Sequence, residues 1–173
     1  NFLYRTELGE LQANGTYKLT PYEVASSLSY LFWGSMPDDT LFLAADQNAL
    51  ETPAQRISQA SRLLAASRSR QQVGNFVGQW LLNASPFSLP SKDATVYPAY
   101  TDAVKAALSQ ELITFFNYVT FDSTQTFREL YTADYVIANK TLADFYHLNG
   151  PTGSAFEKTP VADGSRTVLL TLG

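Results

Sequence analysis

The stretch TDAVKAALSQELITFFNYVT, residues 101–120, decides how the rest of the sequence is interpreted. Its apolar residues recur every three or four positions, which predicts one long helix with a single buried face. Residues 69–83 carry the strongest pattern of this kind in the chain, with apolar residues at i, i+3, i+4, i+7 and i+8. We expect both helices to bury these apolar faces, including Phe76 and Trp80. The same spacing places Leu31 and Ile57 on the apolar faces of two earlier helices.

Three positions carry the signals of helix N-termini. Thr20 precedes a proline and lies three residues before Glu23, so the two residues predict a capping box at a helix start. Thr52 repeats this pattern, and Asn139 is the expected N-cap of a helix over 140–146. The predicted helices run from Thr20 to Gly34, over 37–46, from Thr52 to Leu64, and over 69–83, 101–120, 126–131 and 140–146.

These elements place the chain in the all-α class, with about seven helices in antiparallel pairs. Asn14 and Gly15 tolerate the positive φ of a two-residue turn, and they predict one small N-terminal β-hairpin. Residues 149–165 are dominated by glycine, proline, serine and threonine, which predicts a surface loop. We expect a helical domain over 1–147, and over 148–173 a surface loop and the truncated start of a following domain.

Composition excludes several kinds of chemistry. The 173 residues include no cysteine and one histidine, which excludes disulfides, thiolate or multi-histidine metal sites and c-type haem attachment within this sequence. We therefore expect no metal and no cofactor in this segment. The net charge of −4 argues against nucleic acid as a partner. The sequence contains no apolar stretch of 18 residues, so we expect no membrane span within it. The apolar run 168–172 leads us to expect a piece of a longer protein.

Glu111 is the main candidate for a functional carboxylate. A projection at about 100° per residue places it between Leu108 and Phe115 on the apolar face of the long helix. A carboxylate in such a place is paired or protonated, because burial of an unpaired charge is costly. Two interpretations follow, a tuned catalytic acid or base and a structural ion pair with an arginine. The candidate partners are Arg5, Arg62, Arg68 and Arg70.

Other residues have ordinary structural explanations. His147 follows the helix predicted over 140–146, where an imidazole interacts favourably with the negative helix end. The sequence contains neither a Gly-x-Ser-x-Gly elbow nor a glycine-rich phosphate motif. Tyr97 and Tyr100 are compatible with packing at a helix entry and with an exposed platform for sugars.

Residues 19–39, LTPYEVASSLSYLFWGSMPDD, resemble the most specific motif of a known family. Residues 2–9, 75–81 and 131–139 match the same family in order, as does Glu111 with the two phenylalanines that follow it. This family is the helical domain of unknown function of planctomycete-type, cytochrome-linked exported bacterial proteins. The resemblance covers about residues 1–147, and it departs from the motif at Ser27, where arginine is expected.

The resemblance implies export to the periplasm or the cell surface and a redox or polysaccharide-related setting. It implies that the partners are other domains of the same parent protein or a processed partner chain. It also implies that any haem belongs to the rest of the parent protein. The resemblance supplies no catalytic residue.

Three hypotheses about function follow. The first is a non-catalytic helical scaffold or interaction domain of a larger exported, cytochrome-like multidomain protein. The second is a polysaccharide-active enzyme that uses acids such as Glu111 or Asp134, which requires two carboxylates about 5–10 Å apart across an open cleft. The third is a carbohydrate-binding module that uses exposed aromatic side chains of the region from Tyr97 to Tyr100. Whether the chain is an enzyme stays open at this stage.

Overall fold

The structure is a computed structural model that describes residues 7–82, 92–123 and 126–161. Two compact units make up the chain, Asn1–Gln72 and Val73–Gly173. Within the described residues there are seven α-helices, one π-helical turn and two small antiparallel sheets. The prediction of a helical fold with an N-terminal hairpin is therefore confirmed.

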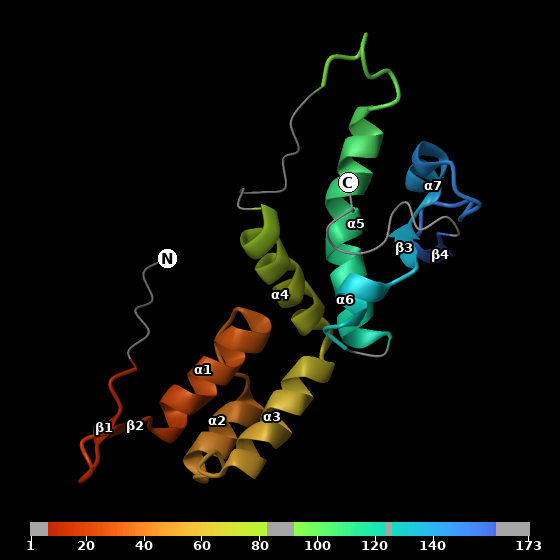
Figure 1. Ribbon diagram of the computed structural model, residues 1–173. Helices are drawn as coiled ribbons and strands as arrows, with labels where there is room; N and C mark the ends of the chain where they lie inside the picture. The colour runs from red at the N-terminus through yellow and green to blue at the C-terminus, as the bar shows by residue number, and fades with distance from the viewer. Residues whose placement is uncertain (1–6, 83–91, 124–125, 162–173) are drawn as a thin grey trace. The chain divides into compact units, whose positions relative to one another are not determined.

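The first unit consists of the hairpin and a group of helices. Its elements are β1 (Glu10–Leu11), β2 (Tyr17–Lys18), α1 (Pro21–Trp33), α2 (Asp39–Asp46) and α3 (Pro53–Ala65). In the turn between β1 and β2, Gly15 has a φ of 81°, which is why glycine is suited to this position. Helix α1 packs against both α2 and α3 (Figure 1). The buried core between these helices contains Ala25, Leu41, Ala44, Ala45, Leu50 and Leu63.

Side-chain caps set the starts of these helices. Thr20 and Glu23 form a reciprocal capping box at α1, and Thr52 and Gln55 form another at α3. In both cases a proline occupies the first turn, where its missing N–H costs no helical hydrogen bond. At the other end of α1, Gly34 takes a φ of 64° and ends the helix. The local sequence alone accounts for these boundaries.

The second unit is built around a long central helix. Its elements are the end of α4 (Ser67–Val77), which crosses the division, a π-turn (Gly78–Leu82), α5 (Asp102–Phe121), α6 (Glu129–Thr132), β3 (Tyr135–Ala138), α7 (Lys140–Tyr146) and β4 (Glu157–Pro160). Helix α5 packs against α6, α7 and β3 (Figure 1). A Cβ on Gly74 would lie 3.0 Å from Ile113 Cγ2, so the glycine permits α4 to approach α5 closely.

The surface-loop prediction for the C-terminal segment is wrong over 157–160, where β4 pairs antiparallel with β3. All four residues of β3 are buried, and on the β4 side Thr159 and Val161 are buried as well. The two strands are separated in sequence by α7 and a polar connection. A four-residue strand gains its stability from its partner, so its own sequence gives only a weak signal. The glycine-rich sequence before β4 therefore predicted a loop.

Several side chains that the helical patterns place in the core are exposed. Phe76 and Trp80 are 58% and 48% exposed, and Leu31 and Ile57 in the first unit are each 65% exposed. The apolar faces predicted from the sequence are therefore wider than the faces that the observed packing covers. A periodic pattern identifies residues on one side of a helix, but it does not say how much of that side a neighbour covers.

Candidate functional site

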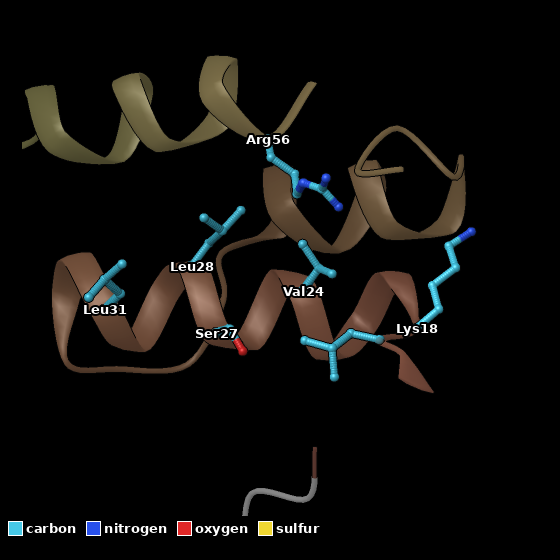
Figure 2. A pocket seen from close by; sticks show the side chains of 7 residues that line it. Lys18, Val24, Ser27, Leu28, Leu31 and Arg56 are labelled. Carbon is cyan, nitrogen blue, oxygen red and sulfur yellow. The ribbon is translucent and has the colours of Figure 1, made fainter. Parts of the chain in front are cut away.

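A shallow, mainly apolar groove of about 410 Å³ opens on the first unit (Figure 2). Val24, Leu28 and Leu31 follow one another along α1 at spacings of four and three residues, so they share one face of that helix. Arg56 projects from α3 toward this row (Figure 2). The remaining lining residues are Lys18, Leu19 and Ser27. The groove thus offers aliphatic surface with cationic groups beside it.

The two cations beside the groove differ in their partners. Lys18 Nζ lies 3.0 Å from Glu51 Oε1, and both side chains are about half exposed. In the part of the chain that the structure describes, the Arg56 guanidinium has neither an ion pair nor a hydrogen bond. Among the lining residues that the structure describes, none is a carboxylate. Arg56 is therefore the group in this groove that is available to an anion.

Glu23 fastens the N-terminal hairpin to the helix that carries the groove. Its Oε2 accepts hydrogen bonds from the backbone N–H and the hydroxyl of Thr20, and its Oε1 accepts from the N–H groups of Leu8 and Gly9 at 2.8 and 3.1 Å. The Thr20 backbone bond and the Gly9 bond are the main reasons that the pKa of Glu23 falls from 4.5 to about 2. The capping box was predictable, but the contact with residues 8 and 9 was not.

Ser27 forms a second link between the hairpin segment and α1. Its hydroxyl donates a hydrogen bond of 2.6 Å to Glu7 Oε1. Ser27, one of the residues that line the groove, is therefore held by an acid from the hairpin segment.

Glu111 is fully buried, as the sequence predicts for its place on α5. The Tyr146 hydroxyl, on α7, donates a hydrogen bond of 2.6 Å to Glu111 Oε2. Both residues belong to the second unit, where Val104, Leu108 and Leu142 make up much of the nearby core. A buried carboxylate bonded in this way joins two helices, and the absence of exposed surface separates it from any dissolved substrate.

The four arginines that the sequence offers as partners of Glu111 differ in their observed contacts. Arg5 lies outside the described residues. Arg62 forms a bidentate ion pair with Asp38, with N–O distances of 2.7 and 3.0 Å, and this pairing lowers the pKa of Asp38. Arg68 lies over the ring of Trp33, with 5.3 Å between the guanidinium carbon and the ring centroid. Arg70 is engaged in an interaction as well.

The remaining predicted positions have structural roles. Asn139 caps α7 by accepting a hydrogen bond from the Leu142 N–H. His147 is the C-cap of that helix and takes a φ of 57°, a conformation more usual for glycine.

Among residues 7–82, 92–123 and 126–161 there is no group of His, Cys, Asp and Glu arranged to hold a metal ion. None of the helices that are described there is long and apolar enough to cross a membrane.

The second unit carries an exposed aromatic pair. The rings of Phe76 and Trp80 stack with their centroids 5.6 Å apart, and Trp80 and Phe116 form a T-shaped pair with their centroids 6.2 Å apart. Trp80 lies in the π-turn, a feature that is frequent at functional sites. Tyr97 and Tyr100 behave differently, since the Lys92 ammonium lies over both rings and Tyr100 packs against the core.

Comparison with known families identifies the chain. The family model described as "Protein of unknown function (DUF1592)" matches residues 19–148, which is most of the sequence. The chain belongs to this family. Searches of curated proteins and of solved structures found no match. The DUF1592 match begins at Leu19 and ends just beyond α7, so it includes the Glu111–Tyr146 pair and every lining residue of the groove except Lys18.

Proposed function

We propose that this DUF1592 domain is a non-catalytic helical scaffold of a larger exported, cytochrome-like multidomain protein, located in the periplasm or at the cell surface. In that protein it would hold neighbouring domains, or a processed partner chain, in a redox or polysaccharide-related setting. Any haem would belong to the other domains. The observation that carries the scaffold role is the apolar groove on α1, where Leu31 is left 65% exposed.

The acidic residues described above support a role without catalysis. Glu23 holds backbone N–H groups, Asp38 holds Arg62, and Glu111 is buried against Tyr146. Glycoside hydrolysis needs two carboxylates facing each other across an open cleft. Asp134 is exposed whereas Glu111 is fully buried, so these two example acids of the enzyme hypothesis do not share an open surface.

Exposed aliphatic surface supports docking. Large exposed apolar patches on soluble domains commonly mark interaction sites, because covering them gains about 25 cal/mol per Å² of apolar area. On α1 the exposed Leu31 continues a row with the partly buried Val24 and Leu28, and a neighbour with complementary shape would cover the three together.

The scaffold role is tested by placing a photocrosslinking amino acid at position 31 of the natural gene product. We expect crosslinks to residues outside 1–173, either in the same gene product or in a chain that copurifies with it. The matched control places the same amino acid at position 144, which is exposed on α7 in the second unit. If position 31 gives no crosslinks beyond those of the control, the scaffold role of this surface is wrong. Cell fractionation tests export separately.

The stacked pair of Phe76 and Trp80 favours carbohydrate binding as a second candidate function. Exposed aromatic rings bind the apolar faces of sugars, and Trp80 presents about half of its surface. We expect soluble oligosaccharides to change the fluorescence of the chain saturably, and Trp80→Phe to weaken this binding. Phe127→Ala removes a comparably exposed ring elsewhere and serves as the control. Unchanged fluorescence across a panel of oligosaccharides would reject this candidate.

A further inference from the structure

We propose that the α1 groove binds an acidic amphipathic helix that belongs to a neighbouring domain. This inference rests on the proposed scaffold function and specifies the chemistry of the partner. Two features of the groove carry it, the spacing of its aliphatic side chains and the charge of Arg56.

The aliphatic row matches what a helix presents. Val24, Leu28 and Leu31 occupy positions i, i+4 and i+7 of α1 (Figure 2). Partners that bind in such grooves place their own side chains at i, i+3, i+4 and i+7 against the apolar surface. The row therefore offers about two turns of helix to the partner, roughly 10 Å at 1.5 Å per residue.

The charge beside the row selects an acidic partner. The Arg56 guanidinium has no ion pair among the residues that the structure describes, and it projects from α3 toward the apolar row. A carboxylate on the flank of the bound helix would accept two parallel hydrogen bonds from it. Lys18 also lines the groove, but its charge is paired with Glu51 at 3.0 Å. A basic partner would be repelled by the Arg56 guanidinium.

The shape of the groove favours a helix over a small molecule. Leu31 lies in its lining and still has 65% of its surface exposed. Pockets for small ligands usually enclose most of the ligand surface, whereas this groove is shallow and open along one helix. A partner helix covers such a surface without needing an enclosed cavity.

The test uses two synthetic helical peptides of about 18 residues, long enough to hold helical structure. Both carry leucine at i, i+3, i+4 and i+7; one has glutamate on its flanks and the other has lysine. Each is titrated into the ¹⁵N-labelled chain, and the amide shifts are followed by NMR. We expect the acidic peptide to shift residues 18–31 and Arg56, and to bind at least about tenfold more tightly than the basic peptide.

Three variants distinguish the contributions of charge and apolar contact. Arg56→Glu should reverse the preference between the two peptides. Leu31→Asp should abolish binding while the fold is kept, because this side chain is exposed. Arg128→Glu makes the same charge change at an exposed position of the second unit and should leave binding unchanged.

The proposal is overturned if neither peptide shifts the groove at about 1 mM, or if both bind equally. It is also overturned if sodium decanoate shifts these residues while the acidic peptide does not, since that assigns the groove to a small amphiphile. Crosslinks from position 31 test the scaffold function without regard to partner charge. Failed titrations with retained crosslinks would therefore reject the acidic helix and leave the scaffold function standing.

Discussion

Replacement of Tyr146 by phenylalanine tests the interpretation of the buried carboxylate most directly. The substitution keeps the ring in its apolar surroundings and removes only the hydroxyl that donates to Glu111 Oε2 at 2.6 Å. Glu111 has no exposed surface, so water cannot replace the lost donor without a change in packing. We expect Tyr146→Phe to destabilise the second unit.

The expected size follows from the kind of bond. Loss of a buried hydrogen bond, which leaves its acceptor away from water, costs about 1–3 kcal/mol. We therefore expect a loss of about 2 kcal/mol in the free energy of unfolding. In a chain of this length, a change of that size lowers the melting temperature by about 4–8 °C.

Urea unfolding followed by circular dichroism measures this loss, and a double-mutant cycle assigns it to the pair. Glu111→Gln should be destabilising by itself, and the coupling energy between the two substitutions should be at least about 1 kcal/mol. Tyr131→Phe, in an exposed tyrosine of the same unit, is the control and should change stability by less than about 0.5 kcal/mol. Unchanged stability in Tyr146→Phe, or strict additivity in the cycle, would refute the structural role of this hydrogen bond.

Three further predictions concern the helix ends and one close contact. The lowered pKa of Glu23, about 2 against 4.5, makes its contribution complete above pH 4.5 and lost as the pH falls toward 2. In Glu23→Gln, the free energy of unfolding should therefore fall less steeply as the pH is lowered from 4.5 to about 2. A decrease as steep as in the original chain would contradict this. His147→Gly should raise the free energy of unfolding by about 0.5–1 kcal/mol, and the melting temperature with it, because residue 147 has a positive φ. A lower melting temperature would contradict this. Gly150→Ala should cost about 1–3 kcal/mol in urea unfolding, because the new Cβ would lie 2.8 Å from Ala143 Cβ; a neutral effect would show that the contact relaxes.

The helix boundaries were the most predictable feature of the fold. At α1, Thr20 and Glu23 satisfy each other's backbone donors within three residues, so no distant contact is needed to place the helix start. Asn139 at α7 is a similar case. The β3–β4 sheet was missed for the opposite reason, because its register joins Tyr135 to Pro160 across α7. Pairing over such a distance leaves little trace in either four-residue segment.

The candidate site was predictable only in part. The buried position of Glu111 follows from its place between apolar residues on α5, but its bond to Tyr146 spans 35 residues and depends on how α7 packs. The groove was not foreseen, because the pattern of α1 suggests that Leu31 is buried. The advance signal was the width of the apolar face of α1, which exceeds what α2 and α3 cover.

Local chemistry in the chain therefore defines where helices start, where the hairpin turns and which side of each helix is apolar, since these properties depend on residues within a few positions of one another. The packed molecule defines the rest: that Glu23 also holds Leu8 and Gly9, that Phe76 and Trp80 are exposed, and that Arg56 lies beside an open apolar row. Burial and pairing depend on which surfaces meet, and segments far apart in the sequence supply those surfaces.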